Sequence, residues 1–372
     1  MPFRMTEMVG CEFPLFGFSH CRDVVAAVSR AGGFGVLGAV SYTPQELEAE
    51  LAWIDENVEG KPYGIDVLIP EVQAVDKAMT ADRIVEAIPP QYRDATATIL
   101  REAGLDEAAG APRGGGQAPN TSLGEELLEV SFSHPVRLIA NALGTAPPAM
   151  IEAGRRHSIP VAALVGAKEH ALKQVAAGVD IVVAQGGEGG GHCGDVATIV
   201  LVPEVIAAIR EAGADIPVLA AGGIMTGAQM AGMMAMGAAG AWCGSAWLAS
   251  PEAETTQVFR DKIVAAGSRD TVRSKYRTGK YSRQLRSGWH DAWEAGGTDA
   301  LPMPLMSLLC EPALRAIDRA AEGGNPAARE LSTYWIGQGV GLIRDQRGAG
   351  RIVQDFKEDF AAAYETLAAA FE

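Results

Sequence analysis

Short runs of apolar residues alternate along the first 250 residues with longer segments of helical periodicity, and glycine often separates the two. The runs are nearly continuous rather than alternating, which is typical of parallel strands buried on both faces. Eight of them are predicted to be strands, at residues 13–16, 34–37, 63–69, 136–140, 161–164, 180–184, 217–221 and 240–243. Eight strands alternating with helices over about 250 residues predict an α/β fold, the closed (β/α)8 TIM barrel.

One region inside this repeat does not fit it. Residues 70–134 form an insertion after the third predicted strand, and the part at 110–120 is rich in glycine and proline. Such composition is typical of a loop between short helices. The insertion is either an ordinary surface addition or a lid over the active site, and the sequence leaves both open.

The pattern changes after residue 250, where it becomes mainly helical. An amphipathic run occupies 253–266 and a second helical stretch forms the tail at 352–371. We therefore expect two units: a barrel formed by residues 1–250, and a helical C-terminal appendage, 251–372, packed on the barrel and able to cover its active mouth.

Composition narrows the range of partners. The 372 residues are 48% hydrophobic and 21% charged, which indicates a packed globular protein. Lys and Arg number 31 against 46 Asp and Glu, a net charge of −15 that disfavours binding to nucleic acid or to anionic membranes. The longest apolar stretch, 231–249, is interrupted by glycines, and no signal-peptide pattern is visible. Five cysteines without CxxC spacing suit reduced thiols, so a cytoplasmic location is expected.

The richest candidate for chemistry is the glycine loop at residues 185–195, which follows the sixth predicted strand. In this fold the active site lies at the carboxyl ends of the strands. Three glycines of the loop match G-x-G-x-x-G, but the next helix is predicted to start only near Pro203, and Asp215 precedes its strand instead of following it. We therefore reject a dinucleotide fingerprint. The glycines instead allow backbone N–H groups to approach an anion or a flat ring.

Glycine also follows the last two predicted strands, as Gly222-Gly223 and as Gly244-Ser245. These turns are the usual phosphate site of a TIM barrel, because their N–H donors and a short helix favour negative charge. A single pair of glycines could simply form a tight turn. Two such turns at these strands predict a phosphate ligand.

Five side chains near predicted strand ends are candidates for the site. His192, on the glycine loop, suits a general base, although a lone histidine is often structural. His20 is open to either role. Gln185 could bind the edge of a heterocycle or cap its own loop, and Asp66 is a buried carboxylate that needs a partner. Cys193 lacks a recognisable pairing for nucleophilic catalysis, and the spacing around His192 does not support a metal site.

Seven cations lie between residues 269 and 286 with only Asp270 among them: Arg269, Arg273, Lys275, Arg277, Lys280, Arg283 and Arg286. One interpretation is a solvated face that pairs with acidic residues of the tail, such as Asp355, Glu358 and Asp359. The other is an edge of the barrel mouth that steers an anionic substrate.

Several blocks of this chain resemble the FMN-dependent nitronate monooxygenase family, formerly called 2-nitropropane dioxygenases. The blocks are 23–38, 184–194, 220–224, 244–245, 277–280 and 335–341, and they span most of the chain except the insertion. The sequence departs from the common family pattern at Phe16–Cys21, where many members have a Gly-Pro-Met-type turn. It also has Asp66 where many have Asn, and Gly189 where many have Ala.

The resemblance implies an FMN cofactor and an oxidoreductase that converts alkyl nitronates with O2 into a carbonyl compound and nitrite. It implies that His192 is the catalytic imidazole. The residues it implies for the cofactor are Gln185, Gly190, Gly191, Gly222, Gly223, Gly244 and Ser245, and Asp66 would meet a ribityl hydroxyl or a flavin N–H. Relatives leave two alternatives: an NAD(P)H-dependent FMN reductase of quinones or enoyl thioesters, and a flavin-binding protein without turnover. The chain could also form oligomers.

Overall fold

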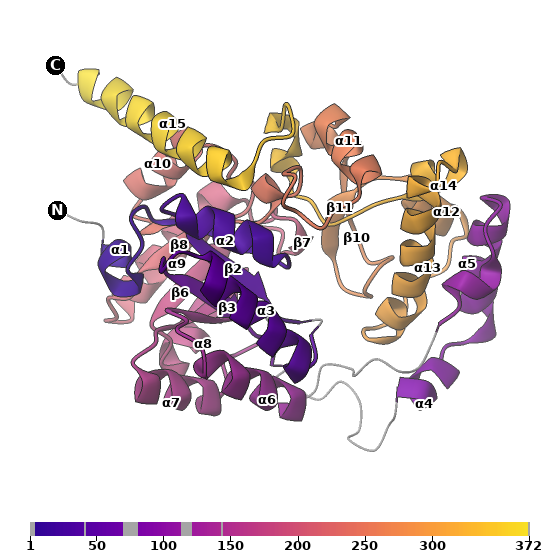
Figure 1. The fold of residues 1–372 in the computed structure, drawn as a ribbon, viewed down its shortest axis with the longest axis horizontal. Coiled ribbons are helices and arrows are strands. Elements are labelled where there is room, and N and C mark those ends of the chain that lie inside the picture. The colour runs from indigo at the N-terminus through magenta and orange to yellow at the C-terminus, as the bar shows by residue number, and fades with distance from the viewer. Residues whose placement is uncertain (1–3, 41, 70–80, 113–120, 143, 371–372) are drawn as a thin grey trace.

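A closed eight-stranded parallel barrel forms the larger part of the molecule (Figure 1). The computed structural model describes residues 4–40, 42–69, 81–112, 121–142 and 144–370. The barrel strands are β1 Leu15–Ser19, β2 Phe34–Gly38, β3 Tyr63–Asp66, β4 Ile139–Asn141, β5 Val161–Val165, β6 Ile181–Gln185, β8 Val218–Ala221 and β9 Gly240–Cys243. The predicted TIM barrel is therefore confirmed, with the first strand placed slightly later along the chain than expected.

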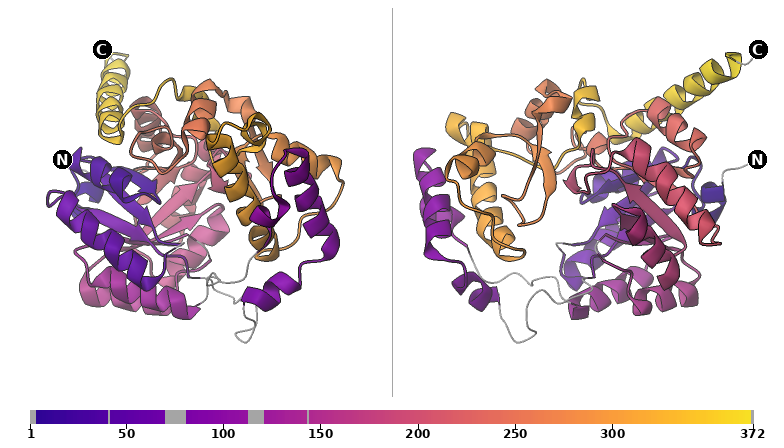
Figure 2. Two further views of the ribbon diagram at one scale, coloured as in Figure 1. Left: turned by 45° about the vertical axis from the view of Figure 1, so that its right-hand side comes forward. Right: turned by 180° about the vertical axis from the view of Figure 1, so that it is seen from behind.

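Helices cover the outside of the barrel (Figure 2). Those that follow a strand are α2 Arg22–Arg30, α3 Pro44–Asn57, α6 Thr121–Phe132, α7 Pro148–His157, α8 Lys168–Ala177, α9 Thr198–Glu211 and α10 Gly227–Ala235, while α1 Arg4–Val9 precedes β1. The expectation that the helix after the glycine loop starts near Pro203 is wrong. The Glu188 carboxylate accepts hydrogen bonds from the backbone N and the Oγ1 of Thr198, both at 2.8 Å, and so caps α9 one and a half turns earlier.

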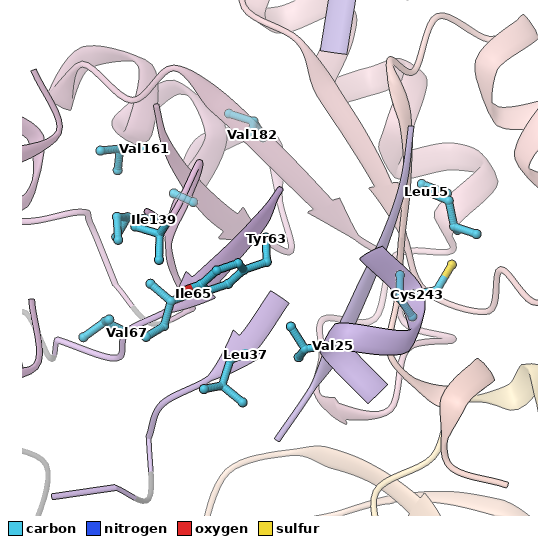
Figure 3. Packing of buried hydrophobic residues seen from close by; sticks show 14 of the residues in the cluster. Leu15, Val25, Leu37, Tyr63, Ile65, Val67, Ile139, Val161, Val182 and Cys243 are labelled. Carbon is cyan, nitrogen blue, oxygen red and sulfur yellow. The ribbon is translucent and has the colours of Figure 1, made fainter. Parts of the chain in front are cut away.

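Apolar side chains fill both sides of the barrel wall. Inside the barrel, the ring of Phe16 lies 4.9 Å from that of Phe34 and 5.9 Å from that of Trp242, measured between centroids. Outside the barrel, apolar strand residues, among them Leu37 and Ile65, pack against the surrounding helices (Figure 3). This double burial explains why the strands read as continuous apolar runs.

The appendage has its own core, and part of the insertion contributes to it. Its elements after the barrel are α11 Gln257–Ala265, β10 Thr271–Ser274, β11 Ser282–Leu285, α12 Gly288–Ala295, α13 Leu305–Glu322 and α14 Pro326–Leu331. From the insertion, α4 Ala81–Glu86 and α5 Pro90–Glu102 pack on α13 (Figure 1). Ile99 and Leu100 share an apolar cluster with Trp289 and Trp293. The last helix of the insertion, α6, packs instead on α3 of the barrel.

The long C-terminal helix α15, Ala349–Ala369, returns to the barrel and packs on α10 and α2. Phe356 is buried and its ring lies 6.4 Å from that of Trp247, while the ring of Phe360 meets Phe13 edge to face at 5.5 Å. The end of α15 extends beyond the barrel (Figure 1), and Tyr364 is 67% exposed there. Among the described residues, no helix is both long and apolar enough to cross a membrane.

Docking of α15 can be tested with two aromatic residues of that helix. Phe356→Ala is expected to lower the free energy of unfolding by about 3–5 kcal/mol, because it removes a fully buried ring and leaves a cavity. Tyr364→Ala is the matched control and should change it by no more than about 0.5 kcal/mol. Urea unfolding followed by circular dichroism measures both, and equal losses would contradict the packing described here.

Candidate active site

Three turns at the carboxyl ends of the barrel strands meet one segment of the appendage, residues 337–339. The backbone N of Gly337 donates a hydrogen bond to Ser245 Oγ at 2.9 Å, after β9. The backbone N of Gln338 donates to the carbonyl of Glu188 at 2.8 Å, in the glycine loop after β6. A methyl group at Gly339 would lie 3.0 Å from the carbonyl of Gly223, after β8. The segment therefore brings together the turns after β6, β8 and β9.

The turns after β8 and β9 hold unpaired backbone donors. These strands are neighbours in the barrel, so their ends lie at one edge. Gly222 and Gly223 have φ angles of +102° and +73°, a conformation that side chains rarely allow. The structure records no hydrogen bond donated by the backbone N–H of Gly223, Ile224, Ser245 or Ala246 to any described residue. Free N–H groups at such an edge suit an anion.

Gln185 ends β6 and holds its own loop. Its Nε2 donates to the carbonyl of Gly190 at 3.3 Å and to that of His192 at 3.2 Å. Gly190 packs tightly against the appendage, since a methyl group there would lie 2.9 Å from the backbone N of Gly337, whereas a methyl at Gly191 would meet nothing within 4 Å. Of the predicted residues, Gly190 therefore shapes the loop and Gly191 lies in open space.

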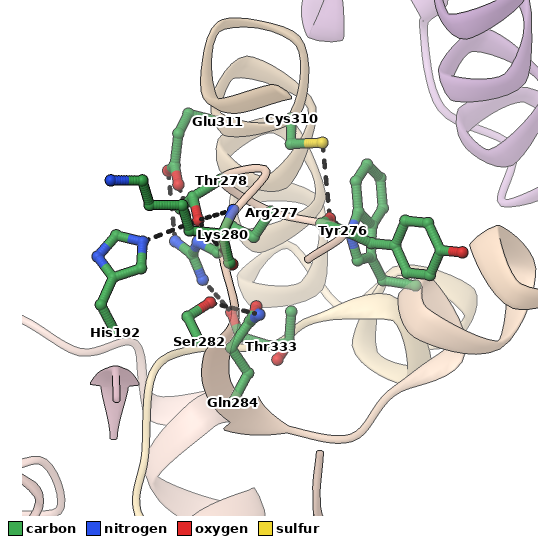
Figure 4. A network of polar contacts seen from close by, with 11 residues as sticks. His192, Tyr276, Arg277, Thr278, Lys280, Ser282, Gln284, Cys310, Glu311 and Thr333 are labelled. Carbon is green, nitrogen blue, oxygen red and sulfur yellow. Dashed lines mark hydrogen bonds and ion pairs between the residues drawn. The ribbon is translucent and has the colours of Figure 1, made fainter. Parts of the chain in front are cut away.

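His192 lies at the boundary between barrel and appendage. With Gly191 it forms the short strand β7, Gly191–His192, which pairs antiparallel with β11 so that His192 faces Ser282 in register. His192 Nε2 lies 2.8 Å from Thr278 Oγ1 (Figure 4). Burial among protein groups, and then the positive charge of Lys280, lower the pKa of His192, although its side chain still reaches solvent. A neutral imidazole with solvent access suits a general base.

Asp66 lies apart from these residues. It ends β3, which the strand order puts across the barrel from β8. Its side chain is buried, and no described group bonds to Oδ1. Burial raises the pKa of Asp66 to about 7, against the opposing effect of a hydrogen bond from the backbone of Ala142. His20, after β1, faces the carbonyl of Gly38 with its Nδ1 at 2.9 Å.

The basic cluster is built into the wall of the site. Arg283 Nε donates to the carbonyl of Gly187 in the glycine loop at 2.9 Å. Arg277 is buried, its Nε lies 2.8 Å from Glu311 Oε1, and its guanidinium lies 3.7 Å from the centroid of the Trp335 ring. The cluster therefore holds the hairpin β10–β11 against the loop instead of forming one uniform face.

The expectation that the acidic tail neutralises this cluster is wrong for the contacts that the structure records. Asp355 pairs with Arg347 and Arg351, and Glu358 also pairs with Arg351. The tail follows α15 onto the barrel, whereas the cluster belongs to the hairpin β10–β11, which explains the separation. Within the cluster, Arg286 pairs with Asp291 and Glu294 of α12, and Arg273 and Lys275 both lie 4.7 Å from the centre of the exposed Tyr281 ring.

Thr278 contacts the candidate base His192, and the sequence analysis did not identify this contact. It belongs to the block 277–280 that carries part of the family resemblance, but it lies 86 positions from His192. Composition and spacing gave no reason to connect the two. Only the pairing of β7 with β11 brings them together.

Nucleophilic and metal chemistry find little support here. Burial raises the pKa of the Cys193 thiol, despite the nearby positive charges of Arg283 and Arg273. A thiol held protonated is a poor nucleophile. No group of three His, Cys, Asp or Glu side chains able to hold a metal ion occurs in the described part of the chain.

Comparisons with known proteins find similar proteins along nearly the whole chain. The family model described as nitronate monooxygenase matches residues 5–359. The Mycobacterium tuberculosis protein "Putative monooxygenase Rv1533" is 48% identical over 367 residues, which cover 97% of this chain and 96% of that protein. The nitroalkane oxidase of Streptomyces ansochromogenes is 27% identical, with a TM-score of 0.79 and 98% and 99% of the two chains covered. FabK of Thermotoga maritima is 25% identical, with a TM-score of 0.73, covering 100% of this chain and 99% of that one.

Asp66 provides a test that does not depend on the ligand of the site. Its pKa is higher in the folded protein, about 7, than the ordinary value of 3.8, so the folded state binds its proton more tightly. The stability that this provides is complete below pH 3.8 and is lost as the pH rises through about 7. Asp66→Asn cannot titrate. Its free energy of unfolding should therefore exceed that of the wild type increasingly between pH 5 and pH 8, by up to a few kcal/mol.

Urea unfolding of ligand-free protein at the two pH values measures this difference. Asp195→Asn, which removes an exposed carboxylate from the same face, is the matched control. A difference between Asp66→Asn and the wild type that stays constant with pH would show that Asp66 is already ionised at pH 5.

Proposed function

The chain belongs to the nitronate monooxygenase family of oxidoreductases, and from that premise we propose that it uses FMN to oxidise alkyl nitronates with O2 to a carbonyl compound and nitrite. One observation carries the proposal. The titratable imidazole of His192 lies on the same glycine loop that meets, through Gly337, the turn carrying unpaired N–H donors at Ser245. The candidate base and the candidate anion site are thus connected through one segment of the appendage.

The residues present fit a single phosphate joined to a flat ring. The N–H groups of Gly223, Ile224, Ser245 and Ala246 would hold the phosphate, within the turns Gly222-Gly223 and Gly244-Ser245. Asp66, across the barrel, has a buried oxygen without a partner and would accept a hydrogen bond from a ribityl hydroxyl or a flavin N–H. Gln185 would offer its free carbonyl oxygen to the ring or its chain, because its nitrogen is already bonded within the loop.

Bound FMN supplies an electron acceptor that O2 can reoxidise. The protein contributes position, charge and proton transfer. With a nitroalkane, neutral His192 would remove the α-proton and produce the nitronate, while the ammonium group of Lys280 contributes positive charge near the anion. With a nitronate supplied directly, this proton transfer is unnecessary. The net oxidation balances when two nitronates and one O2 give two molecules of the carbonyl compound and two nitrite ions, with one oxygen atom joined to each carbon.

Anaerobic mixing of the flavin-loaded protein tests the proposed function against its alternatives. Bleaching of the flavin by a nitronate supports it. Bleaching by NAD(P)H alone would favour a reductase of quinones or enoyl thioesters. Bleaching by neither would indicate a flavin-binding protein without turnover.

We expect the purified protein to be yellow and to carry one non-covalent FMN per chain. Ser245→Asp should abolish retention of the flavin, because its carboxylate would face the phosphate in a poorly screened pocket. Ser245→Ala, which removes the hydroxyl without adding charge, is the control and should retain more. Flavin released by denaturation is identified and quantified by chromatography. Extraction of FAD, or wild-type occupancy in Ser245→Asp, would contradict the assignment.

His192→Asn should keep the flavin and lower turnover of a nitroalkane by roughly 10²-fold or more, the usual effect of losing a positioned base. His170→Asn, on the exposed face of α8, is the matched control. Oxygen consumption and nitrite release measure turnover, and flavin absorbance reports loading. Unchanged rates with both nitroalkane and nitronate would exclude His192 as the catalytic residue.

A further inference from the structure

The contact between His192 and Thr278 determines which nitrogen of the imidazole is basic. Thr278 is buried, and its Oγ1 lies 2.8 Å from His192 Nε2. The same hydroxyl accepts a hydrogen bond from the backbone N of Lys280 at 3.3 Å and can donate to the carbonyl of Lys280 at 3.2 Å. Three groups therefore surround one hydroxyl (Figure 4).

The numbers of protons and lone pairs limit how these three groups can share the Thr278 hydroxyl. A threonine hydroxyl has one proton to donate and two lone pairs to accept with. The N–H of Lys280 occupies one lone pair. If the hydroxyl donates to the carbonyl of Lys280, the second lone pair accepts from His192 Nε2, which must then carry hydrogen. If the hydroxyl donates to His192 Nε2 instead, its hydrogen bond to the carbonyl of Lys280 is lost. A proton could then be added to the ring only at Nε2, and the hydroxyl would have to turn away from that nitrogen.

We propose that Thr278 is a positioning residue that fixes His192 with hydrogen on Nε2, so that Nδ1 is the atom that accepts the substrate proton. In Figure 4 this nitrogen points away from the hairpin that carries Thr278. The inference rests on the proposed function for its catalytic meaning. The tautomer assignment itself is argued from the contacts of Thr278 and does not require the proposed function.

The proton step balances on this assignment. The lone pair of Nδ1 forms a bond to the α-proton of the nitroalkane, and the C–H electron pair becomes part of the C=N bond of the nitronate. His192 becomes an imidazolium whose Nε2–H is still bonded to Thr278, so no hydroxyl has to rotate during the transfer. The nearby positive charge of Lys280, which lowers the pKa of His192, favours return of this proton to solvent.

Thr278 is itself held firmly by the appendage. The neighbouring Arg277 donates from Nε and Nη2 to the two carboxylate oxygens of Glu311, at 2.8 and 3.3 Å. On the other side, β11 pairs with the backbone of His192 at Ser282. The backbone and the ring of His192 are thus both bound to one hairpin, which leaves the imidazole little freedom to turn.

Nitrogen-resolved NMR tests the tautomer directly. In flavin-loaded enzyme labelled with 15N-histidine, long-range 1H–15N correlation distinguishes Nε2–H from Nδ1–H, and His192→Asn identifies the signal among the six histidines. We expect the Nε2–H form alone at a pH where the ring is neutral. An Nδ1–H pattern in the wild type would overturn the proposal without any variant at Thr278.

A matched pair of variants tests the consequence. Thr278→Val keeps the shape of the side chain but removes the hydroxyl, and Thr278→Ser keeps the hydroxyl. Thr278→Val should mix the two tautomers and lower kcat/KM for a nitroalkane roughly tenfold or more, and that for the preformed nitronate much less. Thr278→Ser should recover the nitroalkane rate and the single tautomer relative to Thr278→Val.

The possible results distinguish a failure of the role proposed for Thr278 from a failure of the proposed function. A Thr278→Val enzyme with a single Nε2–H tautomer and the wild-type ratio of nitroalkane to nitronate rates would overturn the role of Thr278. Equal losses of kcat/KM with nitroalkane and nitronate would show that Thr278 has only a structural role. If the wild type oxidised neither substrate, the proposed function would fail, while the wild-type NMR spectrum would still decide the tautomer.

Discussion

The geometry of the site depends on the antiparallel pairing of β7 with β11, which joins a barrel loop to the appendage. A loop so rich in glycine has few side chains to stabilise it and loses much conformational entropy when it is ordered. Its order is supplied from outside: Ser282 pairs with His192, Arg283 bonds to the carbonyl of Gly187, and Gln338 bonds to that of Glu188. The appendage therefore forms part of the candidate active site rather than a cover added to a finished barrel.

This support is only as rigid as the hairpin that provides it. The Arg277–Glu311 pair fixes the hairpin to α13, and Arg277 is buried. Glu311 is 27% exposed, so loss of one partner should cost less than the 3–5 kcal/mol typical of a fully buried pair. α13 in turn packs on α5 from the insertion. A chain of contacts thus leads from residues near position 100 to the imidazole of His192.

The sequence predicts the barrel well, because burial on both faces makes every strand a continuous apolar run. The rule that sites follow strand ends then selects Asp66, His192 and Ser245 as candidates. The sequence does not predict the features that depend on contacts between residues distant along the chain. Nothing local indicates that α4 and α5 pack on α13, or that Thr278 reaches His192. β7 has only two residues, too few for a pattern. The early start of α9 was missed because its cap, Glu188, lies ten positions before Thr198.

Charge at the site argues for a division of roles between neighbouring residues. One imidazole cannot serve as a neutral base and also hold an anion as a cation in the same instant. Burial and Lys280 lower the pKa of His192, which favours the neutral form at neutral pH. The positive charge that an anionic product needs is therefore better supplied by Lys280 itself. His192 lies in β7 and Lys280 lies two residues before β11, so this one pairing would position both the proposed base and a positive charge able to stabilise its anionic product.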